Sequence, residues 1–143
     1  MAMTESATLL SLLPEEQSEP RRPRRAWREK FRAAFRGLKL GIRGHSSFSV
    51  HFFFAALVVA TAIVLGCDKV EWCILLGCIG FVLVAELFNS AIETLFRGLD
   101  EATRERAWPA LDVAAGAVLM ASITAAVIGA IVFLSKFLSK LLA

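Results

Sequence analysis

Three polar side chains inside an apolar stretch, Glu86, Asn89 and Glu93, have the types and spacing that could do chemistry. Spacings of three and four residues place them on one face of a helix. A carboxylate near the centre of a bilayer costs about 2.5–3.5 kcal/mol on insertion scales, so it is rarely found there without a partner or a function. Paired carboxylates can hold Mg²⁺ beside phosphates, and a partly desolvated carboxylate can accept a proton from a hydroxyl. The alternative is that these residues only form hydrogen bonds between helices.

The composition indicates a membrane protein of one domain. The chain has 143 residues, of which 57% are hydrophobic, and its mean hydropathy is +0.62. Ten of the sixteen Lys and Arg residues lie between Arg21 and Arg43, whereas long stretches after Val50 are nearly uncharged. A basic arm on an apolar body favours a membrane surface over nucleic acid, because no nucleic-acid-binding motif accompanies the charge.

The chain divides into a tail, an amphipathic segment and three apolar segments. Residues 1–26 hold prolines, an acidic patch and an arginine cluster, which is typical of a disordered tail. Residues 27–43 alternate apolar and basic side chains at helical spacing, which predicts a helix lying in the membrane interface. The expected membrane spans are residues 50–66, 70–97 and 110–134, with a tight first connection and a second connection from about Gly98 to Pro109.

Charge predicts the orientation of these spans. The N-terminal arm and the second connection carry most of the basic residues, so both are expected on the cytoplasmic side of a bacterial inner membrane. With Val70 at the outer boundary, Glu86 lies about 24 Å and Glu93 about 35 Å along the second span. Because the hydrocarbon core is about 30 Å thick, both carboxylates, with Asp112 of the third span, are expected near the cytoplasmic boundary.

Two motifs resemble the small prokaryotic diacylglycerol kinase family, which includes undecaprenol kinases. They are Glu86-Leu-Phe-Asn89-Ser-Ala-Ile-Glu93 and Leu111-Asp112-Val-Ala-Ala-Gly-Ala-Val, and the similarity extends over roughly residues 30 to 134. The resemblance implies a homotrimer of three-span subunits with an interfacial N-terminal helix. It also implies transfer of the γ-phosphate of MgATP to the hydroxyl of a membrane lipid.

The resemblance also implies roles for individual residues. Glu86 would be the general base and Glu93 a ligand of Mg²⁺. Asn89 would support the nucleotide or the base, and Asp112 would complete the polar site from a neighbouring helix. Four positions depart from the family pattern: His45 replaces an acid, Ser49 a basic residue, Arg97 an Asp and Leu111 a Lys. These departures cluster on the nucleotide side. Arg97 is therefore the first candidate for the missing phosphate-binding cation, and the arginines of the interfacial segment 27–43 are the alternative.

Two alternative functions remain open at this level. The chain could be a catalytically silent relative that binds lipid or assists membrane assembly, which the missing nucleotide-side residues favour. It could also form a proton or ion path, although acids gathered at one boundary do not favour transport. An assay of lipid phosphorylation separates the first alternative from a lipid kinase.

Overall fold

The computed structural model describes residues 26–44 and 47–142, and within these ranges it is helical with no strand. The elements are α2 (Trp27–Gly44), α3 (Ser47–Leu65), α4 (Lys69–Arg97) and α5 (Glu101–Leu141). The expected tail, apart from its last residue, and His45 lie outside the described residues.

Helices α3, α4 and α5 are each long and apolar enough to cross a membrane, which confirms the prediction of three membrane-spanning helices. Their large apolar side chains are mostly exposed; Phe53, Phe88 and Val113 are examples. The small interior holds Leu75 and Ala121, each 2% exposed. Apolar surface on this scale requires a hydrocarbon environment, so the chain is a multi-pass membrane protein.

The connection between α3 and α4 is a tight turn with a strong helix cap. Gly66 adopts a φ of 66°, a conformation that favours glycine. Asp68 then caps α4 by accepting hydrogen bonds from the backbone N–H groups of Val70 and Glu71, while the Glu71 side chain accepts from the Asp68 N–H. Lys136 of α5 forms an ion pair with Glu71 at 2.8 Å, which ties the far end of α5 to this turn.

The connection between α4 and α5 is much shorter than expected, and the prediction that it extends to Pro109 is wrong. Helix α5 begins at Glu101 and contains Pro109. The reason is Asp100, whose carboxylate accepts from the N–H and hydroxyl of Thr103 and so starts the helix at Glu101, seven residues before Trp108. The Arg104 guanidinium also donates to the carbonyls of Phe96 and Arg97, which are the last carbonyls of α4.

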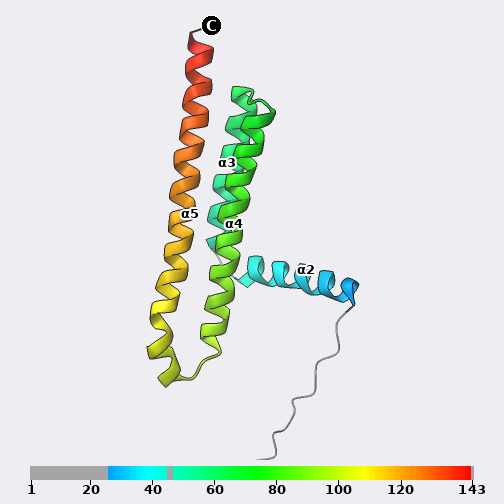
Figure 1. Cartoon of the computed structure of the whole chain (residues 1–143), viewed down its shortest axis with the longest axis vertical. Helices are drawn as coiled ribbons and strands as arrows, with labels where there is room; N and C mark the ends of the chain where they lie inside the picture. Colours follow the sequence, from blue (N-terminus) through cyan, green and yellow to red (C-terminus); the bar gives the residue numbers. More distant parts are fainter. Residues whose placement is uncertain (1–25, 45–46, 143) are drawn as a thin grey trace, which may run out of the picture. The chain divides into compact units, whose positions relative to one another are not determined.

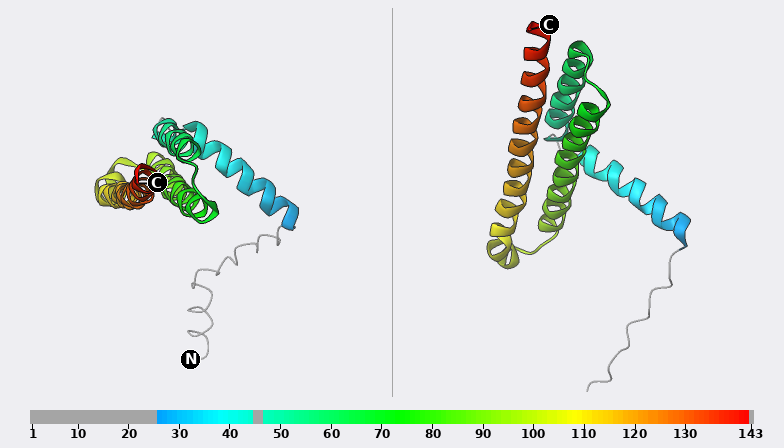
Figure 2. Two further views of the ribbon diagram at one scale, coloured as in Figure 1. Left: turned by 90° about the horizontal axis from the view of Figure 1, so that it is seen from above. Right: turned by 45° about the horizontal axis from the view of Figure 1, so that its top comes forward.

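The two short connections make α4 antiparallel to both α3 and α5 (Figure 1). Helix α5 packs along α4, and both contact α3 (Figure 2). The shorter α3 begins partway along α4, beside Glu86, and the end of α4 and the start of α5 lie together at one end of the bundle. This end carries the polar residues singled out from the sequence, while the α3–α4 turn closes the opposite end.

Candidate active site

Glu86 is almost completely buried, with 2% of its surface exposed, at the contact between α4 and α3. The Ser47 hydroxyl, in the first turn of α3, donates a hydrogen bond to its Oε1. One turn along α3, the Nε2 atom of His51 lies 3.7 Å from Oε2. A carboxylate withdrawn from solvent in this way needs such partners, because an isolated buried charge is costly.

The sequence did not reveal the two partners of Glu86. Neither Ser47 nor His51 belongs to the motifs that carry the family resemblance. Their proximity to Glu86 depends on the register of α3 against α4, which no spacing within one helix contains. The only indication in the sequence is that the family resemblance, which extends over roughly residues 30 to 134, includes both positions.

The other two residues of the polar face form a chain of contacts along α4. The Asn89 side-chain amide donates to Glu93 Oε1 at 3.0 Å. Arg97 donates to Glu93 Oε2 at 3.2 Å, with its side chain 62% exposed and that of Glu93 35% exposed. Both contacts join residues four apart, so one helix is sufficient to make them.

A cavity of about 320 Å³ lies between α4 and α5 beside this chain of contacts. It brings together four of the five residues predicted for the site: Asn89, Glu93 and Arg97 from α4, and Asp112 from α5. Leu111, at the position of the family lysine, also lines it. Glu86 does not line it, because its carboxylate faces α3. We call this space the α4–α5 cavity.

Aromatic residues line the end of the α4–α5 cavity that is nearest to the α4–α5 connection, and a helix cap lies in that connection. Phe96 and Trp108, both lining residues, pack edge to face with ring centroids 5.5 Å apart. The family has an Asp at the position of Arg97. The next acid along the chain, Asp100, does not line the cavity, and its carboxylate accepts a hydrogen bond from the Thr103 hydroxyl. The Thr103 hydroxyl and N–H hold the pKa of the Asp100 carboxyl below its usual range, so Asp100 is a charged helix cap.

Ser90, which the sequence did not single out, lies on the same face of α4 between the two glutamates. It is 1% exposed, and its hydroxyl has no hydrogen-bond partner among the described residues. A buried hydroxyl without a partner costs free energy. We find no structural role for it in the described residues.

The donor set of the α4–α5 cavity fits Mg²⁺ in its common binding mode. Among the described residues, no group of three or more His, Cys, Asp or Glu side chains could hold a metal without other ligands. Mg²⁺ in phosphate sites, however, typically takes only one or two carboxylates and completes its shell with water and substrate phosphates. Glu93 and Asp112, with the Asn89 amide oxygen, supply that smaller set in one cavity.

Fold and site together define a class: a small helical protein with three membrane-capable helices and a carboxylate-rich site at one end of the bundle. The family model described as prokaryotic diacylglycerol kinase matches residues 32–133. The chain belongs to this family, which confirms the resemblance found in its motifs.

Two curated relatives support this membership. A diacylglycerol kinase of Synechocystis sp. is 31% identical over 110 residues, which are 76% of this chain and 63% of that protein. The chain thus matches less than two thirds of the length of this relative. An undecaprenol kinase of Bacillus subtilis is 31% identical over 108 residues, 76% of this chain and 88% of that protein. No solved structure matches the chain.

Proposed function

We propose that this protein is a lipid kinase that transfers the γ-phosphoryl group of ATP to the hydroxyl of a membrane lipid, either a diacylglycerol or a polyprenol such as undecaprenol. The names of the two relatives support this reaction class. The observation that carries the proposal is the buried carboxylate of Glu86, which accepts a hydrogen bond from Ser47 and lies near His51, less than one helical turn from Asn89 in the lining of the α4–α5 cavity.

On the lipid side, Glu86 accepts the proton of the attacking hydroxyl. Ser47 donates to one carboxylate oxygen and so fixes its orientation. The other oxygen lies 3.7 Å from His51, which is beyond hydrogen-bond distance, so it keeps its capacity to accept a proton. The lipid oxygen bonds to the γ-phosphorus, the bond from that phosphorus to the bridging oxygen breaks, and ADP leaves.

On the nucleotide side, the residues of the α4–α5 cavity bind the phosphates. Glu93, Asp112 and Asn89 would hold Mg²⁺, which supplies charge neutralisation for the phosphate oxygens when bound. Arg97 contributes a cation where the family lysine is replaced by Leu111. Glu86 and Glu93 are seven residues apart, which is about 10 Å along α4. A lipid hydroxyl and a nucleotide γ-phosphate can therefore meet between them.

We further propose the arrangement of this kinase in the membrane. Helix α2 lies in the interface, because exposed Trp27, Phe31 and Phe35 alternate with basic residues along it. The basic arm and the α4–α5 connection lie on the cytoplasmic side of the bacterial inner membrane. The functional unit is a homotrimer, as the family resemblance implies, and nucleic acid is not a partner.

The test is phosphorylation by the purified protein in vesicles. The protein is incubated with MgATP and vesicles containing diacylglycerol, a polyprenol or phospholipid alone. We expect a phosphorylated product from one of the two alcohols, and no product when the magnesium is chelated. A folded protein that binds these lipids but phosphorylates neither would instead support the catalytically silent alternative.

A further inference from the structure

The imidazole of His51 is a second titratable group beside Glu86. Its Nε2 atom lies 3.7 Å from Glu86 Oε2, whereas the hydrogen bond from Ser47 goes to the other carboxylate oxygen, Oε1. The two side chains differ in their access to the surroundings, because 18% of the His51 side chain is exposed and only 2% of that of Glu86. His51 therefore lies between the buried carboxylate and more accessible space.

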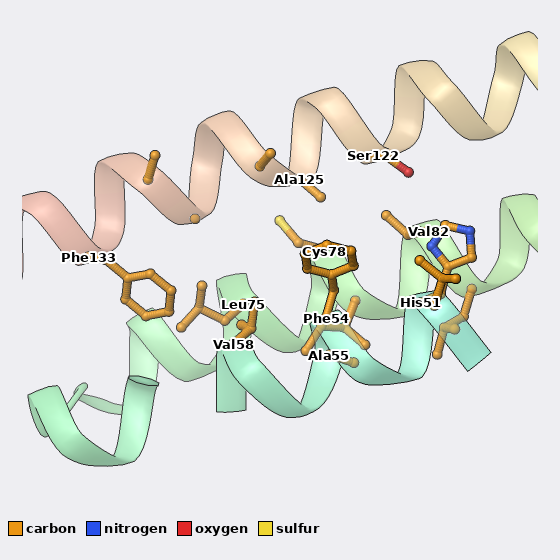
Figure 3. A pocket seen from close by; sticks show the side chains of 16 residues that line it. His51, Phe54, Ala55, Val58, Leu75, Cys78, Val82, Ser122, Ala125 and Phe133 are labelled. Carbon is orange, nitrogen blue, oxygen red and sulfur yellow. The ribbon is translucent and has the colours of Figure 1, made fainter. Parts of the chain in front are cut away.

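His51 also lines a hollow of about 430 Å³ between α3, α4 and α5. Figure 3 shows its ring near one end of this hollow, at the end where the hydroxyl of Ser122 from α5 also lies. His51 and Cys78 are the titratable residues of the lining, and α5 contributes the uncharged Ser122. Among the described residues that line the hollow or contact the ring, Glu86 of α4 is thus the acid that faces His51.

The proposed reaction leaves one proton on Glu86 in each turnover. The lipid oxygen bonds to the γ-phosphorus, ADP leaves, and the hydroxyl proton remains on the Glu86 carboxyl. Phosphate monoesters have a second pKa of about 6, so the product keeps little of this proton near neutral pH. The carboxyl must lose the proton before the next hydroxyl can react, although it is almost completely buried.

Of the two side chains beside this carboxyl, His51 is the one that can take the proton. The Ser47 hydroxyl donates to Oε1, and a hydroxyl is not protonated near neutral pH. A neutral imidazole has an ordinary pKa of about 6.5, so it gains and loses protons at physiological pH. A distance of 3.7 Å is too long for a hydrogen bond, but contacts of this kind often shorten when the reacting complex forms.

From this geometry, and resting on the proposed function, we infer that His51 is a proton relay that receives the transferred proton from Glu86 and passes it to water. In its neutral form, Nε2 accepts the proton from Glu86 Oε2. The imidazolium then loses a proton to water, which restores both groups for the next turnover. In its charged form, His51 instead pairs with the ionised Glu86 and has no site that can accept a proton.

The test is the pH dependence of turnover in vesicles for the parent and for His51→Gln. Parental kcat should fall as the pH decreases through about 6.5, because the imidazolium cannot accept a proton. His51→Gln should lack this decrease, and above about pH 7 its kcat should be about 10²-fold below that of the parent, the lower end of the range for a lost proton-transfer group. Its KM for MgATP should be parental, since His51 does not line the α4–α5 cavity. His45→Gln, which removes the other histidine of the chain, should keep the decrease.

Addition of free imidazole separates a proton relay from a packing role. His51→Ala leaves space for an imidazole molecule next to the hollow. Imidazole should restore part of the turnover of His51→Ala but none of that of Glu86→Gln, which lacks the proton acceptor. Parental rates and an unchanged pH profile in His51→Gln would overturn the inference and show that the proton leaves with the product. A loss in His51→Ala that imidazole does not relieve would also overturn it, because packing would then explain the loss.

A measurement on the unmodified protein replaces the variants if they do not fold. The protein with isotope-labelled histidine is titrated by NMR, and the His51 imidazole should change its protonation state between about pH 5 and 8. An imidazole that stays in one state over this range would overturn the relay. Parental phosphorylation that the His51 variants leave unchanged would reject the relay alone, whereas absence of phosphorylation by the parent would reject the kinase and the relay with it.

Discussion

Glu86 and Glu93 lie two turns apart on the same face of α4, yet their surroundings are built differently. Glu86 is 2% exposed and takes both of its described partners from α3, whereas the Glu93 side chain is 35% exposed and bonds to Asn89 and Arg97 of its own helix. The Glu86 site depends on tertiary packing, and the Glu93 site on helix geometry and the facing wall of α5. In the proposed kinase, the first handles the lipid and the second the nucleotide.

The largest effect is expected from removing the carboxylate of Glu86. Glu86→Gln keeps the shape of the side chain and its bond from Ser47 but removes the proton acceptor. We expect turnover to fall by about 10²–10⁴-fold, the range for loss of a general base. Lipid phosphorylation rates in vesicles measure this. Glu105→Gln, at an exposed carboxylate of α5, is the control, and near-parental turnover of Glu86→Gln would remove Glu86 from this role.

A smaller loss of turnover is expected when Ser47, the α3 residue that orients Glu86, is replaced. Ser47→Ala removes the hydrogen bond to the carboxylate, and hydrogen bonds to charged groups contribute about 1.5–3 kcal/mol, so kcat should fall by about tenfold or more. The KM for ATP should not change, since Ser47 does not line the α4–α5 cavity. Ser49→Ala removes an exposed hydroxyl of the same helix and should behave like the parent. Equal effects of the two variants would contradict a specific role for Ser47.

This division also explains which parts could be predicted from the sequence. The three membrane helices followed from apolar length, and the alignment of Glu86, Asn89 and Glu93 followed from helical periodicity. The partners of Glu86 could not be predicted, because they depend on how α3 packs against α4. The start of α5 was misplaced because Pro109 was treated as a boundary, although the local cap of Asp100 and Thr103 determines it.

On the nucleotide side, the largest expected change is a gain in affinity for MgATP. Leu111→Lys places a cation in the wall of the α4–α5 cavity, and a charge-assisted contact to phosphate should tighten MgATP binding by about tenfold or more. Leu111→Met is the neutral control, and the double variant with His45→Glu tests the second departure from the family. Binding is measured by equilibrium titration of MgATP. High parental affinity that Leu111→Lys leaves unchanged would indicate that Arg97 already supplies this cation.

The smallest effect is expected at the opposite end of the bundle, far from both sites. Hydrogen bonds from the backbone N–H groups of Glu71 and Val70 hold the pKa of the Asp68 carboxyl below its usual range. The capping contribution is therefore fully present above the ordinary Asp pKa and is lost as the pH falls through the lower, folded-state value. Asp68→Ala should lower the melting temperature slightly at neutral pH and leave kinase activity unchanged. A loss of activity without a loss of stability would contradict a purely structural role.

The separation of lipid and nucleotide tasks is tested most directly by MgATP binding to the Glu86→Gln variant, measured by calorimetry in vesicles beside its phosphorylation rate. We predict parental affinity for MgATP together with turnover that is almost abolished, because the α4–α5 cavity is intact in this variant. Loss of MgATP binding in Glu86→Gln, or retention of turnover, would contradict the assignment of Glu86 to the lipid and of the α4–α5 cavity to the nucleotide.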